Sequence, residues 1–148
     1  MQIKWEGVMP AVTTKFTKED TLDLQMFEIN IQAQLKAGVS AIILGGTLGE
    51  ASTLTDDEKK ILIQETVRIV DGNIPVIINI AEQTTKGAIE AASKAKKYGA
   101  SGLMMLPPMR YKANDFETVT YFKEVAKSTD LPIMIYNNPV DYGIEVTL

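Results

Sequence analysis

Five short apolar runs constrain the fold of this 148-residue chain more than any other feature. The runs occupy residues 8–14, 41–44, 75–80, 103–106 and 132–136. Within them, apolar residues mostly follow one another instead of alternating with polar ones, which is typical of parallel strands buried on both faces. The runs recur about every 30 residues, the length of one β-α-β unit. The pattern therefore predicts an α/β fold built on a parallel sheet.

Amphipathic stretches between the runs predict four helices, and capping residues indicate where these begin and end. The residues expected at the N-terminal ends are Asp20 or Thr21, the capping box of Thr55 and Glu58, and Asp115. Gly38 and Gly99 are expected to end the first and third helices, because glycine readily adopts the left-handed conformation found there. A further helix is expected to begin at Thr147, because threonine is a favoured residue at the N-terminal cap of a helix.

Two architectures agree with this alternation of strands and helices. A flavodoxin-like, doubly wound sheet of five strands fits a chain of 148 residues. A complete (β/α)8 barrel needs about 250 residues, which is more than the chain contains. The apolar pattern alone does not distinguish the open sheet from a portion of a barrel.

The composition excludes several classes of site. The sequence contains no cysteine and no histidine, which removes disulfides, the usual ligands of zinc and copper, and a Ser-His-Asp triad. Its net charge is −4 and no basic cluster stands out, which argues against nucleic acid or an anionic membrane surface as a partner. No apolar stretch reaches about 18 residues and the N-terminus does not resemble a signal peptide, so we expect a cytoplasmic protein without a metal or cofactor.

A glycine-rich loop, residues 44–50, follows the second apolar run. Glycines allow backbone N–H groups to turn toward a ligand and approach it closely, so the loop suits a carboxylate or a phosphate. It matches neither the dinucleotide-binding fingerprint nor the P-loop. The alternative interpretation is an ordinary glycine-rich turn between a strand and a helix.

Two further motifs follow the fifth and fourth runs, respectively. Tyr136, in the stretch 135–139, lies where a strand ends, and a hydroxyl there can transfer protons. Its alternative role is a core tyrosine whose hydroxyl is bonded to the backbone. Arg110, in the stretch 106–111, follows two prolines and could bind a carboxylate through two parallel hydrogen bonds. Its alternative role is a solvated surface arginine.

Taken together, these motifs resemble the dihydrodipicolinate synthase and N-acetylneuraminate lyase family. The resemblance runs from residue 7 to the end of the chain, and it is carried by residues 46–50, 106–108 and 136–139. It implies a (β/α)8 TIM barrel, of which residues 1–148 would be the N-terminal part, with the first five strands and four helices. It also implies a homo-oligomer, a tetramer or a dimer.

The family condenses or cleaves 2-oxo acids, usually pyruvate, through a lysine Schiff base. By resemblance, the Thr47 hydroxyl and the backbone N–H groups of Thr47 and Leu48, with Gly46, would hold the substrate carboxylate. Tyr136 would relay protons, so Thr47 and Tyr136 are the expected catalytic residues. Arg110 and Asn138 complete the expected substrate-binding set.

The family's lysine lies at the end of the sixth strand. Extending the repeat of about 30 residues puts that strand near positions 160–165, beyond Leu148. Lys15 is the one lysine expected near a barrel mouth, and a solvated surface position suits it better. We therefore expect these 148 residues to be part of a longer protein.

Three positions depart from the family pattern. Leu48 stands where many members have a second threonine, and Arg110 stands where the synthases carry a tyrosine that completes a proton relay across a subunit interface. Asp141 replaces an arginine that binds the carboxylate of the second substrate, and an acid would repel a carboxylate. A sister activity, such as deamination of a hydroxylated pyrroline carboxylate, is one alternative. A non-catalytic half-barrel or flavodoxin-like ligand-binding module is the other.

Overall fold

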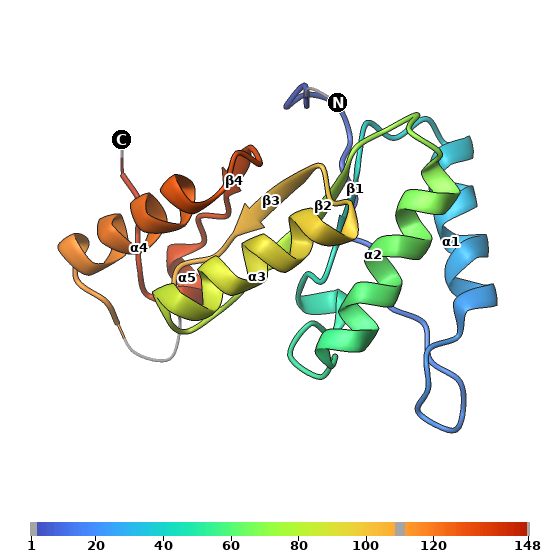
Figure 1. The fold of residues 1–148 in the computed structure, drawn as a ribbon, viewed down its shortest axis with the longest axis horizontal. Helices are drawn as coiled ribbons and strands as arrows, with labels where there is room; N and C mark the ends of the chain where they lie inside the picture. Colours follow the sequence, from blue (N-terminus) through green and yellow to red (C-terminus); the bar gives the residue numbers. More distant parts are fainter. Residues whose placement is uncertain (1–2, 109–111, 148) are drawn as a thin grey trace.

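A sheet of four parallel strands forms the centre of the computed structural model, which describes residues 3–108 and 112–147 (Figure 1). The strands are β1 (Ile42–Leu44), β2 (Val76–Ile80), β3 (Gly102–Met105) and β4 (Ile133–Ile135). They pair in sequence order, β1-β2-β3-β4, and every pair is parallel. These strands fall on the second to fifth apolar runs of the sequence.

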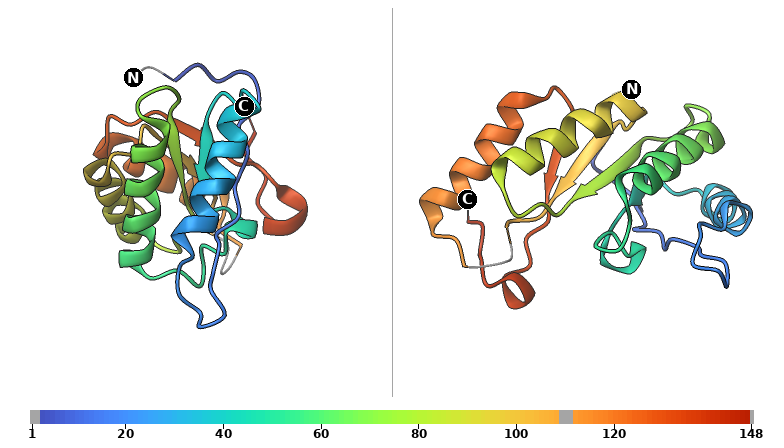
Figure 2. Two further views of the ribbon diagram at one scale, coloured as in Figure 1. Left: turned by 90° about the vertical axis from the view of Figure 1, so that its right-hand side faces the viewer. Right: turned by 60° about the horizontal axis from the view of Figure 1, so that its bottom comes forward.

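Four longer helices alternate with the strands: α1 (Leu24–Lys36), α2 (Asp56–Val70), α3 (Thr85–Tyr98) and α4 (Asp115–Ser128). Two short helical segments follow strands, the 3-10 turn η1 (Thr47–Gly49) and α5 (Pro139–Tyr142). In Figures 1 and 2, α2 to α4 lie together over one side of the sheet, with α1 beside α2. Within the described residues, no helix is both long enough and apolar enough to cross a membrane.

The strand order decides between the two architectures left open by the sequence. A flavodoxin-like sheet has the order 2-1-3-4-5 and carries helices on both faces. Here the strands follow one another in sequence order, and the buried apolar residues of α1 to α4 all belong to one core cluster. Sequential parallel strands with helices on one side form a segment of a (β/α) barrel. The barrel prediction is confirmed, and the flavodoxin-like alternative is wrong.

Two apolar clusters occupy the two faces of the sheet, because successive strand residues point to opposite sides. The outer cluster joins the sheet to the helices and includes Leu44, Val76 and Leu103. The inner cluster contains the alternate strand residues, Ile43, Ile77, Met104 and Leu106, together with Ile3 and Ala41. In a complete barrel the inner residues of all strands fill the interior, so the inner cluster is one wall of a barrel core.

The first predicted strand, residues 8–14, is only partly formed. It is extended beside β1 and pairs with it through a single parallel bridge between Ala11 and Ile43. The Ile43 N–H donates to the Pro10 carbonyl at 2.9 Å, and the Val12 N–H donates to the Ile43 carbonyl at 3.0 Å. Pro10 has no N–H to contribute to a ladder, so the prediction of a continuous first strand is wrong although its position beside β1 is confirmed.

Two predicted caps are also wrong by a few residues. Asp23, not Asp20 or Thr21, caps α1 and accepts a hydrogen bond of 2.9 Å from the Met26 N–H. The two earlier residues belong to a turn in which the Asp20 φ is +58°. Asn114, not Asp115, caps α4.

The remaining caps agree with the sequence analysis. The capping box of Thr55 and Glu58 is present at α2, and Gly99 ends α3 with φ +101°. The helix expected to begin at Thr147 would lie outside the described residues.

Candidate functional site

A cavity of about 180 Å³ opens at the carboxyl ends of the strands, on the inner face of the sheet. Its walls come from the glycine-rich loop, three strands or the residues after them, and α5. The lining residues are Ala11, Gly46, Thr47, Leu48, Asn79, Met104, Leu106, Tyr136 and Tyr142. The fold therefore brings together four of the residues singled out in the sequence, although about 90 positions separate the loop from the tyrosine motif.

The loop after β1 folds into the single turn η1, for which Gly46 is the N-terminal cap. The Gly49 N–H donates to the Gly46 carbonyl at 2.9 Å. The first N–H groups of a helical turn have no partner within that turn, and here they belong to Thr47 and Leu48. Both residues are exposed at the cavity wall, so these donors lie where a bound anion could meet them.

Contacts from neighbouring segments hold this loop in place. The Thr14 hydroxyl donates a buried hydrogen bond of 2.6 Å to the Gly49 carbonyl. Gly45 adopts φ +66°, in the left-handed region where a side chain is disfavoured. The Thr14 hydrogen bond and the Gly45 backbone angle therefore both help to define the loop conformation.

Asn79 is a site residue that the sequence analysis missed. It is the one polar residue of β2 and occupies an inward position between apolar neighbours. Its amide donates to the Gly45 carbonyl at 2.8 Å, while its Oδ1 is buried with no partner among the described residues. A lone polar residue inside an apolar run was the available signal, because such a residue needs a specific partner when it is buried.

Tyr136 follows the last strand residue, and its N–H donates to the Met105 carbonyl at 2.8 Å. Within these 148 residues Tyr136 is 43% exposed, and it lines the cavity. The rings of Tyr136 and Tyr142 lie 6.0 Å apart between centroids, inclined at 56°. Tyr142, also missed in the sequence, ends α5 on the same wall.

The remaining predicted site residues lie elsewhere. Asn138 caps α5: its amide donates to the Asp141 carboxylate at 2.6 Å, and its Oδ1 accepts from the Asp141 N–H at 3.3 Å. It is not among the residues that line the cavity. Arg110 lies outside the described residues. Lys15 does not line the cavity either, and its carbonyl accepts a hydrogen bond from the Asp23 N–H at 2.8 Å.

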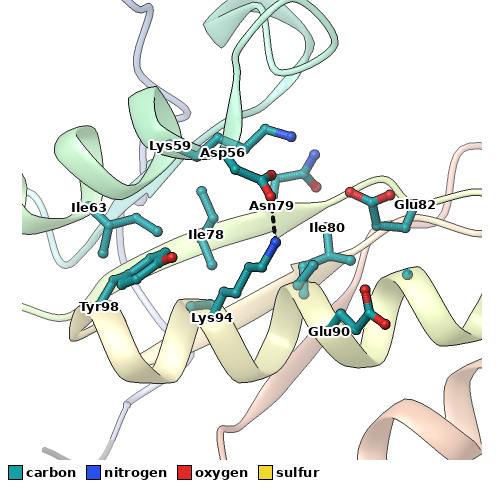
Figure 3. Close-up of a pocket in the computed structure, with 13 residues that line it drawn as sticks. Asp56, Lys59, Ile63, Ile78, Asn79, Ile80, Glu82, Glu90, Lys94 and Tyr98 are labelled. Atoms are coloured by element: carbon teal, nitrogen blue, oxygen red, sulfur yellow. Dashed lines mark hydrogen bonds and ion pairs between the residues drawn. The ribbon is translucent and has the colours of Figure 1, made fainter.

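A second cavity, of about 200 Å³, lies between α2 and α3 on the outer face of the sheet (Figure 3). Lys94 of α3 reaches across it to the carboxylate of Asp56, an ion pair whose hydrogen bond lowers the pKa of Asp56 and raises that of Lys94. Asn79 lines this cavity as well as the first. None of the predicted site residues lines it, so the inner cavity is the candidate site.

The chain resembles known proteins along almost its whole length. The model of the dihydrodipicolinate synthetase family matches residues 4–148. The 4-hydroxy-tetrahydrodipicolinate synthase of Exiguobacterium sibiricum is 37% identical over 144 residues, which are 97% of this chain and 49% of that protein. The chain thus spans about half the length of the curated relatives it matches.

Solved structures agree with this result. Dihydrodipicolinate synthase from Thermotoga maritima superposes with a TM-score of 0.91 at 35% identity, over 94% of this chain and 47% of that one. A prophage protein of the dihydrodipicolinic acid synthase family from E. coli K12, in complex with pyruvate, superposes with a TM-score of 0.90 at 32% identity. The match covers 97% of this chain and 48% of that one. On the family match and these similarities, the chain belongs to the dihydrodipicolinate synthetase family.

Proposed function

We propose that the protein containing this chain is a lyase that forms a lysine Schiff base with pyruvate or a related 2-oxo acid. The observation that carries the proposal is the shared cavity of Thr47 and Tyr136 at the carboxyl ends of the strands. Active sites of barrel enzymes form at that end of the sheet. A similar structure from E. coli K12 contains pyruvate, which supports a small 2-oxo acid as the substrate.

In this proposal the η1 turn binds the substrate carboxylate. Gly46 permits close approach of the backbone, the N–H groups of Thr47 and Leu48 donate hydrogen bonds, and the Thr47 hydroxyl adds another donor. Hydrogen bonds to a charged acceptor are shorter and stronger than those between neutral groups. Because the loop is already held by Thr14 and Asn79, little ordering is needed when the carboxylate binds.

Tyr136 is proposed as the proton donor and acceptor beside the reacting carbonyl. A hydroxyl that lines the cavity can give a proton to the departing carbonyl oxygen and receive one in return. Arg110 and Asn138 remain predicted substrate-binding residues. The side-chain hydrogen bonds of Asn138 to Asp141 support a role in holding α5.

The amine of the Schiff base is expected from a lysine near positions 160–165 of the longer polypeptide. The nine described residues that line the cavity include no lysine. Borohydride reduction of the full-length protein in the presence of pyruvate should attach one reduced pyruvate to a lysine, which intact mass and peptide mapping would locate. No adduct would contradict the proposed chemistry, and an adduct within residues 1–148 would contradict the expected position of the lysine.

The reaction proposed is that of a 4-hydroxy-tetrahydrodipicolinate synthase-like enzyme, because the matched relatives carry that name. Those relatives do not favour the deaminase or the non-catalytic module. Asp141 lies on α5, whose last residue lines the cavity, and a carboxylate there disfavours a second substrate with an anionic group at that point. Steady-state assays of the full-length protein with pyruvate and a series of aldehydes, with and without a carboxylate, would identify the second substrate.

We also propose a homo-oligomer, a tetramer or a dimer, located in the cytoplasm. The support is the family resemblance together with exposed apolar residues on α4: Phe116 is 80% exposed and Val119 is 49% exposed. Light scattering coupled to size-exclusion chromatography of the full-length protein would measure its mass in solution. A monomer at micromolar concentration would contradict the proposed assembly.

A further inference from the structure

Tyr142 lies on the cavity wall, and the short helix α5 holds it there. The Asn138 side chain caps this helix, and the Tyr142 N–H donates to the Asn138 carbonyl at 3.0 Å. Gly143 ends the helix with φ +64°. The Tyr142 ring also packs against the inner apolar cluster. Its position is therefore set on both sides, by the helix and by the core.

Tyr142 has two neighbours in the cavity. Its hydroxyl and the Thr47 side chain line the same cavity, near enough for a hydrogen bond from Thr47 to lower the Tyr142 pKa. Its ring also lies against that of Tyr136, with the centroids 6.0 Å apart. Three hydroxyl groups from three separate segments thus surround the space where the 2-oxo acid is proposed to react.

We propose that Tyr142 is a proton-transfer residue of this site, acting through the hydroxyl of Thr47. The same chain then supplies both tyrosines that this proposal uses. The inference rests on the proposed function, because it concerns the protons of Schiff-base chemistry. It goes beyond that function in assigning a role to a residue outside the motifs that carry the family resemblance.

The surroundings of Tyr142 suit a neutral proton donor. Burial raises the pKa of its hydroxyl, nearby Tyr136 raises it further, and the hydrogen bond from Thr47 opposes both effects. The net direction is upward, so the hydroxyl keeps its proton at neutral pH. A general acid must hold its proton until the transition state requires it.

Formation of the Schiff base fixes the path of the protons. The lysine nitrogen forms a bond to C2 of the 2-oxo acid, the C2–O bond breaks, and the oxygen leaves as water. The two protons of that transfer come from the nitrogen and end on the oxygen. Tyr142 donates one through Thr47 to the oxygen and is reprotonated from the nitrogen by way of Tyr136, so the three hydroxyls are unchanged after the step.

The enamine step uses the same groups. The C3–H bond of the imine breaks, its electron pair becomes the C2=C3 bond, and the former C=N π pair moves to nitrogen. The hydroxyl groups carry the released proton from C3 to the nitrogen, which gives a neutral enamine. When the step reverses in D2O, a deuteron returns to C3, so the methyl group of pyruvate becomes deuterated at a rate that reports proton transfer.

The test is this exchange, followed by NMR with the full-length protein at saturating pyruvate. Tyr142→Phe keeps the ring and removes the hydroxyl, and it should slow the exchange about 100-fold, the low end of the roughly 100- to 10,000-fold range of general acid–base catalysis. The pyruvate concentration at half-saturation should stay within about 2-fold, because the carboxylate contacts remain. The matched control Tyr98→Phe removes a hydroxyl on α3, away from this cavity, and should leave the exchange rate unchanged.

A double-mutant cycle tests the route through Thr47. If Tyr142 acts through that hydroxyl, Tyr142→Phe in a Thr47→Val background should slow the exchange less than 2-fold further, because residues that act as a unit are not additive. Thr47→Ser, which keeps a hydroxyl, should restore sensitivity to Tyr142→Phe. Additive losses in the Val background would overturn the route through Thr47.

The amount of borohydride-trapped pyruvate separates this inference from the proposed function. If the Tyr142→Phe variant shows normal trapping and a wild-type exchange rate, the role of Tyr142 is overturned, whereas the Schiff-base function is not. Absence of trapping in the unsubstituted protein would overturn the Schiff-base function instead. Normal trapping by a slowly exchanging Tyr142→Phe variant would support the inference, because a protein that failed to fold would not form the adduct.

Discussion

The side-chain amide of Asn79 donates a hydrogen bond of 2.8 Å to the carbonyl oxygen of Gly45, which joins the end of β2 to the loop after β1. This bond links two neighbouring strands of the barrel at the edge where the cavity opens. The loop it holds carries Thr47, the proposed carboxylate-binding residue. A polar residue of the inner wall thus contributes to the shape of the site without belonging to a recognised motif.

Replacement of Asn79 by alanine should lower the free energy of unfolding by about 1 kcal/mol, the usual net value of one hydrogen bond. Alanine also removes the Oδ1 atom, which is buried without a hydrogen-bond partner among the described residues. Its removal offsets part of the lost stability. Asn73→Ala is the matched control, since it removes an amide–carbonyl bond of 2.9 Å in a turn away from the cavity. Hydrogen exchange should increase in residues 45–50 for Asn79→Ala only, and equal exchange in both variants would contradict the assigned contact.

Replacement of Thr14 by valine should destabilise the protein by about 1–3 kcal/mol, because the buried Gly49 carbonyl loses its donor. Thr14→Ser keeps the hydroxyl and should recover most of that loss. Urea unfolding of the two variants measures the difference. Equal stability of the valine and serine variants would show that the hydroxyl does not hold the loop.

Replacement of Gly45 by alanine should cost about 1–2 kcal/mol, because its φ of +66° is disfavoured for a residue with a Cβ. The new Cβ would also lie 3.2 Å from the Ile78 Cδ1 and crowd the loop. Gly72→Ala is the control, with φ +72° and no atom within 4 Å of the added Cβ. Thermal unfolding should show a loss in both variants, whereas pyruvate binding should weaken only in Gly45→Ala.

Stability should fall at alkaline pH through Tyr121. Burial, and then the charge of Glu82, raises the pKa of this hydroxyl well above its ordinary value of 10.0, and the hydroxyl donates to the Glu82 carbonyl at 3.1 Å. The pKa of the hydroxyl is higher in the folded than in the unfolded state. Its contribution to the free energy of unfolding is therefore fully present below about pH 10 and is lost as the pH rises toward the folded-state pKa. Unfolding free energies measured from pH 8 to 11 should decline less steeply for Tyr121→Phe, and parallel profiles would contradict this assignment.

The stability that the ion pair of Asp56 and Lys94 contributes should be lost at acid pH (Figure 3). The hydrogen bond from Lys94 lowers the pKa of Asp56 below 3.8, so its contribution is present above that value and is lost as the pH falls through the lowered pKa. Both side chains are largely exposed, so the effect should be small and should diminish with added salt. Unfolding of Lys94→Gln at pH 7 and pH 3, at low and high salt, tests this, and a large salt-independent loss at pH 7 would contradict it.

Much of the local structure could be read from the chain, because it depends on neighbours in sequence. Unbroken apolar runs placed the four strands, and the capping box of Thr55 and Glu58 placed the start of α2. The misplaced cap of α1 shows the limit of this reasoning: Asp20 and Asp23 are both suitable residues, and only the turn that gives Asp20 a left-handed backbone assigned the cap to Asp23.

Sequence alone determined that the chain is α/β, that the loop at residues 45–50 and Tyr136 end parallel strands, and which family these motifs resemble. The tertiary structure decided that helices cover one face of a sequentially ordered sheet, and it brought Asn79 and Tyr142 to the cavity beside Thr47. The physical reason is the sequence distance over which each interaction acts. Caps and apolar runs act within a few residues, whereas the contact of Tyr142 with Thr47 joins segments about 95 residues apart and exists only after the sheet has curved and packed.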